Sequence, residues 1–92
     1  MPDPVTLTGR LICADAAEAA TVRNHLPRHA ALTRAEPGNL RFEVVPDGPL
    51  EWRVDEAFTD AEAFRHHQAR AAASDWGRAT AGIRRDYRVE GL

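Results

Sequence analysis

The chain has 92 residues, enough for one domain over residues 1–92 but too few for two domains that each bury a core. A chain of this size buries only about two-thirds of its unfolded surface, and a ligand pocket would reduce that core further, so we expect a homodimer. The formal net charge of -2 argues against a nucleic-acid-binding protein, which normally carries a strongly basic face.

The composition also excludes several chemistries and locations. All twelve basic residues are arginine, so no lysine is available for a Schiff base or a phosphate-binding loop. The single Cys13 cannot form an intrachain disulfide, and no apolar run approaches the ~20 residues that span a bilayer. The segment Met1-Pro2-Asp3-Pro4 lacks the pattern of a secretory signal. We therefore predict a cytoplasmic protein that does not enter a membrane.

The first third of the chain reads as a strand followed by a helix. Apolar residues alternate over residues 5–13, which predicts a strand with one well-buried face. Asp15 and Glu18 have the spacing of a capping box, and helical periodicity continues from there to about Arg34. Pro27 interrupts that run, so we expect the helix to kink or break just before it.

The remaining segments complete a βαββαβ order. Turn residues at 36–38 and 46–49 separate the next strands, and Thr59 with Glu62 forms a second T-x-x-E capping box. The further elements expected are strands 40–45, 50–58 and 83–90, a helix over 60–73 and a short helical turn before Gly82. This order predicts a ferredoxin-like α+β domain with a four-stranded antiparallel sheet and two helices on one face. A second copy would cover the other face.

His67 and Glu56 are the strongest candidates for chemistry. His67 shares a helix face with Phe64, toward the sheet, where an imidazole could act as a base or could simply be a structural histidine hydrogen-bonded at a helix border. Glu56 lies on the apolar face of the third strand, so its carboxylate must be paired, protonated or at the sheet edge. It is either half of an ion pair with Arg85 or Arg10, or a base with a raised pKa.

Histidines and aromatic residues supply candidates for a pocket wall. His25 and His29 have the i,i+4 spacing of metal ligands but lack the glutamate of a zincin motif, and we predict no metal site. His29 could still line a pocket. Phe64, Trp76 and Tyr87 are either core residues or the walls of a flat site for an aromatic ligand. No phosphate loop or nucleophile elbow is present, so flavin, nicotinamide and nucleotide cofactors have no signature.

Taken in order, several of these residues resemble the antibiotic biosynthesis monooxygenase family, with similarity from about Val5 to Val89. The residues that carry the resemblance are Arg34, Glu36-Pro37-Gly38, Phe42, Glu56, His67 and the pair Ser74 and Trp76. The resemblance implies a dimeric α+β barrel that oxidises a quinol or polycyclic phenol with O2 and no cofactor. His67, with Glu56 or Arg10, would bind and deprotonate the phenol. Together with the pocket candidates above, we predict that Trp76, Arg10, His29, Phe64 and Tyr87 bind the substrate.

The chain also departs from the family pattern. Asn39 stands where members often have cysteine, and Ser74-Asp75-Trp76 occupies the region of a second histidine in many of them. Two alternatives stay open: a non-catalytic dimeric domain that binds a small aromatic ligand, and a haem-degrading relative, whose Asn, Trp and His set does not map cleanly here. A pocket that binds a phenol and one that oxidises it can differ only in solvent exclusion and oxygen access.

Overall fold

The computed structural model describes residues 3–92, so Met1 and Pro2 of the predicted domain and N-terminal segment lie outside the described residues. Within residues 3–92 the elements are β1 (Val5–Ile12), α1 (Ala16–Arg34), β2 (Asn39–Pro46), β3 (Glu51–Phe58), α2 (Ala61–Ala72), α3 (Asp75–Ala79) and β4 (Arg84–Glu90). The predicted βαββαβ order is confirmed, and α3 occupies the segment where a helical turn was expected. No helix in this part of the chain is long and apolar enough to cross a membrane.

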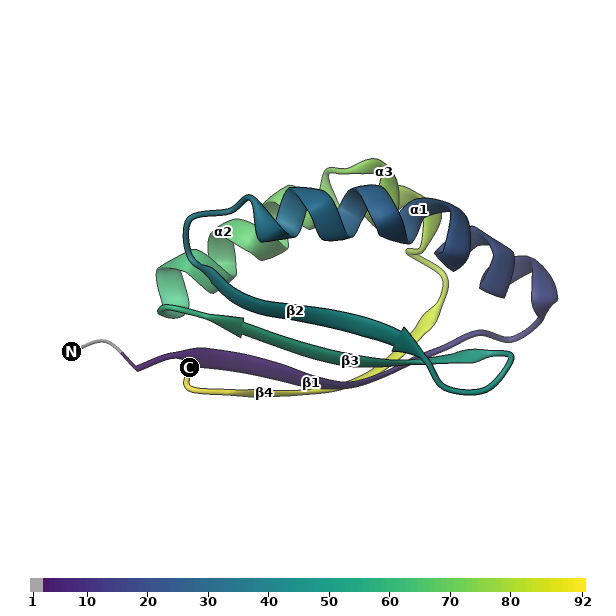
Figure 1. The fold of residues 1–92 in the computed structure, drawn as a ribbon, viewed down its shortest axis with the longest axis horizontal. Coiled ribbons are helices and arrows are strands. Elements are labelled where there is room, and N and C mark those ends of the chain that lie inside the picture. The colour runs from purple at the N-terminus through teal and green to yellow at the C-terminus, as the bar shows by residue number, and fades with distance from the viewer. Residues whose placement is uncertain (1–2) are drawn as a thin grey trace.

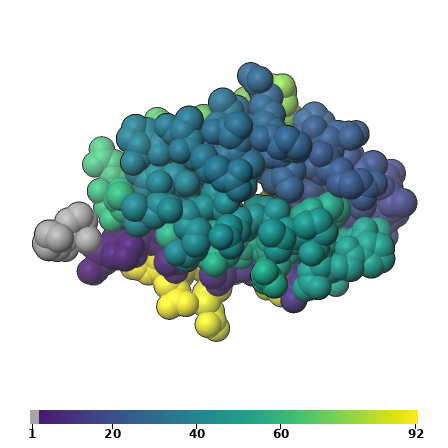
Figure 2. Space-filling view, in the orientation of Figure 1, coloured from purple at the N-terminus to yellow at the C-terminus, as the bar shows by residue number. Residues whose placement is uncertain are grey.

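The strands of residues 3–92 form one four-stranded sheet in the order β2-β3-β1-β4, and every neighbouring pair is antiparallel. All the helices lie on one face of this sheet (Figure 1). The space-filling view shows α1, in blue, packed along the strands of the β2–β3 hairpin, in teal (Figure 2). The predicted ferredoxin-like α+β fold is therefore confirmed.

The two faces of the sheet differ sharply in chemistry. Strand alternation turns the apolar side chains of β1 and β3 toward the helices, where they form the core: Val5, Leu7, Leu11, Trp52, Val54 and Phe58. The opposite face is rich in charge, and there Arg41 Nη2 lies 2.8 Å from Asp55 Oδ1. An antiparallel sheet can keep such a face in water. That a second copy of the chain covers this face stays a prediction, because a charged face can remain in water without a cover.

The predicted cap of α2 was wrong, and of the kink or break predicted at Pro27 the break does not occur. The N-cap of α2 is Asp60 rather than Thr59: Asp60 has the extended backbone of a capping residue, and its Oδ1 accepts a hydrogen bond from the Ala63 N–H at 2.8 Å. Helix α1 runs without a break through Pro27, since a proline removes a single backbone donor and the buried face on both sides holds the helix on the sheet. The capping box at Asp15 is confirmed.

The turn between α1 and β2 contacts α2 closely. A Cβ on Gly38 would lie 2.4 Å from the Ala63 Cβ, so this position needs glycine for the turn to approach the start of α2. Arg34 fixes the other side of the turn, with Nη2 donating to the Phe42 carbonyl at 2.9 Å and its Cζ 5.7 Å from the Phe42 ring centroid. These contacts bring Glu36, in the turn, alongside α2.

Candidate active site

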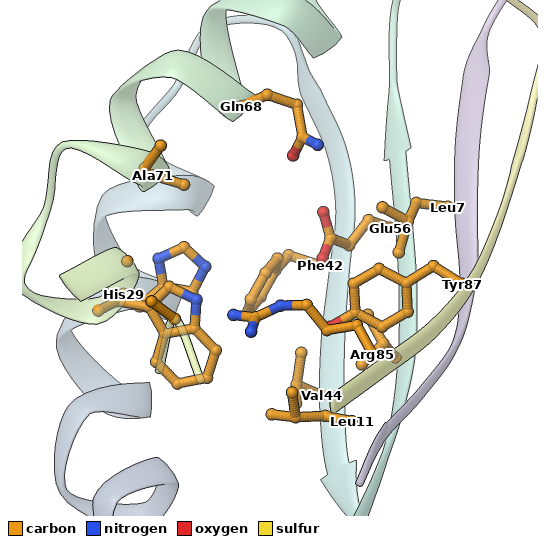
Figure 3. A pocket seen from close by; sticks show the side chains of 15 residues that line it. Leu7, Leu11, His29, Phe42, Val44, Glu56, Gln68, Ala71, Arg85 and Tyr87 are labelled. Carbon is orange, nitrogen blue, oxygen red and sulfur yellow. The ribbon is translucent and has the colours of Figure 1, made fainter. Parts of the chain in front are cut away.

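A cavity of about 290 Å³ lies between the inner face of the sheet and the helices (Figure 3). Its apolar wall comes mainly from the strands, and its polar groups come from both layers. The apolar residues include Leu7, Leu11, Phe42, Val44 and Val54, and the polar ones are His29, Glu56, Gln68, Arg85 and Tyr87. A mostly apolar cavity with a few converging polar groups is the usual form of a small-molecule site.

Glu56 presents its carboxylate to this cavity from the middle of β3 (Figure 3). The residue is 6% exposed, and its Oε1 has no hydrogen-bond partner among residues 3–92. Burial, with the nearby charge of Glu36 as the next cause, raises the pKa of Glu56 to about 7. A carboxyl group with this pKa is a proton acceptor matched to neutral pH.

His67 lies behind Glu56 rather than in the cavity wall. Its ring is 2% exposed, and its Nε2 is 3.5 Å from Glu56 Oε1. Its Nδ1 is 2.9 Å from Glu36 Oε1. Burial lowers the pKa of His67, although the carboxylate of Glu36 opposes that shift. The predicted face of the helix is confirmed, and His67 can act on a ligand in the cavity only through Glu56.

Glu36 is the functional candidate that sequence reasoning missed. Its second oxygen, Oε2, accepts from Arg70 Nε at 2.5 Å, and Arg70 Nη2 donates to Thr33 Oγ1 at 3.1 Å. Glu36 was interpreted as part of a turn and of the family motif but was given no functional role, and turn residues have no periodicity that predicts where their side chains point. The available signal was its chemistry, because an acidic residue directly before a Pro-Gly turn can be drawn into the core by a histidine and an arginine.

His29 and Trp76 form a stacked pair at the helix side of the cavity. Their ring centroids are 4.6 Å apart with an interplanar angle of 5°. His29 is buried, its Nδ1 has no hydrogen-bond partner among residues 3–92, and burial lowers its pKa to about 3. The ring is therefore neutral at physiological pH and available to hydrogen-bond a ligand. Within the described residues no cluster of His, Cys, Asp and Glu could hold a metal ion.

Arg85 and Tyr87 complete the cavity from β4. Arg85 donates from Nη1 to the Thr80 carbonyl at 2.7 Å and from Nη2 to Thr80 Oγ1 at 2.8 Å, which ties the guanidinium to the segment after α3. The group still points into the cavity toward His29 (Figure 3). Burial raises the pKa of Tyr87 to about 12, so its hydroxyl is neutral. The structure contains no Glu56–Arg85 ion pair within residues 3–92, and the ion-pair alternative for Glu56 is not realised with this partner.

The comparison with known families decides the identity. The model of the family described as antibiotic biosynthesis monooxygenase matches residues 5–79. The chain belongs to the antibiotic biosynthesis monooxygenase family. No functionally curated protein matches it in sequence.

Solved structures of similar fold cover nearly the whole of this chain. SnoaB of Streptomyces nogalater, described as a cofactor-independent oxygenase, has 20% identity and a TM-score of 0.79 over 98% of this chain and 93% of its own. MupZ of Pseudomonas fluorescens has 17% identity and a TM-score of 0.82 over 99% of this chain and 70% of its own. Rv0793 of Mycobacterium tuberculosis has 17% identity and a TM-score of 0.75 over 98% and 95%. At these identities the likeness concerns the fold.

Two residues predicted to bind substrate do not reach the cavity of this monooxygenase-family protein. Arg10 lies on the outer face of the sheet and pairs with Asp47, so its predicted contact with Glu56 is wrong; strand alternation separates the two by the thickness of the sheet. Phe64 packs in the core against Phe58, with ring centroids 5.6 Å apart, and does not line the cavity. The structure does place Trp76, His29 and Tyr87 in the cavity wall.

Proposed function

We propose that this protein is a cofactor-free monooxygenase that oxidises a compact phenol or hydroquinone with O2 in the cavity between sheet and helices. The observation that carries the proposal is Glu56, a buried carboxyl group with an unpaired oxygen, facing a largely apolar cavity. An unpaired buried carboxyl group costs stability, which favours a chemical role over a structural one.

The chemistry needs a base and a dry site. A phenol has a pKa of about 10 and donates electrons poorly until it loses its proton. Glu56 takes that proton, and the guanidinium of Arg85 stabilises the resulting phenolate in surroundings of low dielectric. The phenolate then reduces O2. One oxygen atom becomes a new carbonyl on the ring, and the other leaves as water with the phenolic hydrogen and one ring hydrogen.

The size of the cavity limits the substrate. Its volume of about 290 Å³ is at the low end of the range of about 300–1,000 Å³ for ligand pockets. Hydroquinones and fused-ring phenols of two rings are therefore the first compounds to test, ahead of larger polycyclic phenols. His29 and Trp76 offer a stacked aromatic surface at the helix side of such a ring.

The relatives support the proposal in general terms. The family is described by monooxygenase activity, and SnoaB is described as a cofactor-independent oxygenase. We also propose a homodimer formed through the outer sheet face, where charges of both signs, such as Arg41 and Asp55, could pair between copies, and a cytoplasmic location. Sedimentation velocity measures the dimer: a single species of monomer mass at micromolar concentration would contradict it.

The test is oxygen uptake by purified, metal-free protein across a panel of hydroquinones and phenols. We expect uptake above the autoxidation blank with at least one compound, and a loss of about 10²–10⁴-fold in kcat for Glu56→Gln. The matched control is Asp55→Asn, the neighbouring carboxylate on the opposite face of the sheet, which should keep kcat.

Two other results would favour the alternatives. Thermal stabilisation by several phenols without oxygen uptake by any of them would indicate a binding domain. A Soret band after addition of haemin to the protein, with oxygen uptake only in its presence, would indicate a haem-degrading relative. Either result would contradict the cofactor-free oxidation of phenols.

A further inference from the structure

We propose that Glu36, His67 and Glu56 form a proton relay, in which His67 holds the first proton that Glu56 removes from the substrate and Glu36 positions His67 for this task. The inference rests on the proposed function. It assigns a positioning role to Glu36, which lies outside the cavity wall, and a proton-holding role to a histidine that does not touch the substrate.

The three side chains lie in a row that starts at the cavity. Glu56 Oε1 is 3.5 Å from His67 Nε2, and His67 Nδ1 is 2.9 Å from Glu36 Oε1. The side chains of Glu36, Glu56 and His67 are 9%, 8% and 3% exposed, so bulk water has little access to any of the three. Of the three, Glu56 lines the cavity.

Glu36 determines which nitrogen of His67 carries the proton. A carboxylate only accepts hydrogen bonds, so His67 donates to Glu36 from Nδ1–H and keeps the lone pair of Nε2 toward Glu56. Arg70, 2.5 Å from the other oxygen of Glu36, holds that carboxylate in place. The arrangement is the one in which an acidic group orients a histidine for proton transfer.

Glu56 and His67 are slightly too far apart for a hydrogen bond. At 3.5 Å it is longer than a hydrogen bond, and Glu56 Oε1 has no other partner among residues 3–92 that would resist a movement. Hydrogen bonds of catalytic groups are often long in the free protein and shorten when substrate binds. A ligand in the cavity would close this gap by pressing the carboxylate toward the histidine.

The reaction requires Glu56 to accept a proton twice, first from the phenolic hydroxyl and later from the ring carbon, and a second proton holder keeps Glu56 ionised while the C–O bond forms. Glu56 takes the phenolic proton and passes it to Nε2 of His67, which leaves Glu56 ionised again. The phenolate forms a C–O bond with O2, and the resulting peroxide anion receives the stored proton through Glu56. Glu56 then takes the hydrogen of the same ring carbon as a proton, the C–H electron pair forms the carbonyl, the O–O bond breaks, and hydroxide leaves with that proton as water.

Several other groups face the relay and set its protonation. Around His67 these are Arg70 and His66 on α2 and His29 on α1, whose ring centroid is 5.9 Å from that of His67. Around Glu56 they are Arg85 and Tyr87 on β4; Asp55 on β3 adds only the smallest charge effect, from the opposite face of the sheet, where its carboxylate is paired with Arg41. The charge of Glu36 adds to the rise in the pKa of Glu56 and opposes the lowering of the pKa of His67 by burial. Removing that charge should therefore lower the pKa of both groups.

The first test needs no substrate. Two-bond ¹H–¹⁵N NMR of the histidine rings in the wild-type protein reports the tautomer of His67. The relay predicts a proton on Nδ1 and none on Nε2 at pH values where the ring is neutral. A proton on Nε2 would overturn the relay, whatever compound the protein oxidises.

The second test uses Glu36→Gln, with Glu62→Gln as the matched control. Glu62 is an exposed carboxylate in the first turn of α2, and the ion pairs of His67 do not include it. For Glu36→Gln we expect kcat to fall about 10–100-fold, as for other carboxylates that orient a histidine, with KM little changed. The acid limb of the pH profile should move to lower pH, because Glu56 loses a neighbouring negative charge.

The outcomes separate the relay from the proposed function. Wild-type kcat and an unmoved acid limb in Glu36→Gln would overturn the relay and leave the monooxygenase proposal intact. No turnover by the wild-type protein would contradict the proposed function, while the NMR measurement would still decide the arrangement of the relay. A Glu36→Gln variant that does not fold leaves the wild-type tautomer as the deciding observation.

Discussion

Asp55 and Glu56 are neighbours on β3 and yet meet opposite surroundings. Asp55 points to the outer face of the sheet, where its carboxylate accepts two hydrogen bonds from Arg41 at 3.1 and 2.8 Å and remains open to water. Glu56 points inward, is 6% exposed, and leaves one oxygen without a hydrogen bond among residues 3–92. The period of two in a strand produces this difference from adjacent positions.

The difference shows where this small domain tolerates buried polar groups that lower its stability. Exposed ion pairs such as Asp55–Arg41 contribute little to stability, and the sheet keeps them in water. Glu56 and His29 lie on the inner side as buried polar groups with shifted pKa values, at the expense of stability. Both line the same cavity. The unpaired groups are concentrated where a ligand would bind.

The largest expected effect on stability is a pH dependence of opposite sign at the two buried groups. The pKa of Glu56 is raised from 4.5 to about 7, so its contribution to stability is fully present below 4.5 and is lost as the pH rises through 7. The pKa of His29 is lowered from 6.5 to about 3, so its contribution is present above 6.5 and is lost as the pH falls toward 3. These shifts correspond to roughly 3 and 5 kcal/mol.

Urea unfolding of single variants between pH 4 and 8 would separate the two terms. Relative to wild type, Glu56→Gln should gain stability as the pH rises from 4.5 to 7, and His29→Gln should gain it as the pH falls below 6.5. The exposed histidine His66 supplies the control His66→Gln. Difference curves that are flat for both variants would show that the inner groups behave like those of the outer face.

A smaller effect is expected at the turn that holds Glu36. In Gly38→Ala the new Cβ would meet the Ala63 Cβ at 2.4 Å, so the turn or α2 must shift, and we expect a loss of about 1–3 kcal/mol in the free energy of unfolding. Gly82→Ala is the control, because nothing lies within 4 Å of a Cβ there. Equal stability of the two variants would mean that the turn does not press on α2 as described.

The smallest effect is expected on the outer face. Arg10→Ala removes an exposed pair with Asp47 and should lower the melting temperature less than Gly38→Ala does, with no change in the Kd of an aromatic ligand. Differential scanning fluorimetry with and without ligand measures both quantities. A loss of ligand affinity in Arg10→Ala would contradict the separation of the two sheet faces.

Periodicity was sufficient to predict the fold and the inward position of the main candidates. Strand alternation placed Glu56 with Trp52 and Val54, and helical spacing placed His67 with Phe64; the structure confirms that all of them are buried. The same rule contradicted the pairing of Arg10 with Glu56, since Arg10 has the parity of Ile12 rather than of Leu11. That pairing was predicted from charge alone, without comparing the parity of the two residues on their strands.

What the sequence could not predict depends on side chains outside periodic elements. Glu36 lies in a turn, and its contacts with His67 and Arg70 require α1, the turn and α2 to be packed together first. Phe64 and Trp76 both belong to the buried core, yet only Trp76 also lines the cavity, and no sequence pattern distinguishes the two. Thr59 and Asp60 are both residue types that cap helices, so the sequence alone does not show which of them is the N-cap of α2.

The central claim is that Glu56 removes a proton from a phenol bound in the cavity, and anaerobic absorbance spectroscopy tests it most directly. A phenol with a distinct phenolate band, bound without O2 at pH 7.5, a value above the pKa of about 7 for Glu56, separates deprotonation from the later oxidation. We predict a phenolate band with the wild-type protein and with Asp55→Asn, and the neutral phenol with Glu56→Gln. A neutral phenol bound to the wild-type protein, or an equal phenolate band in Glu56→Gln, would contradict the account.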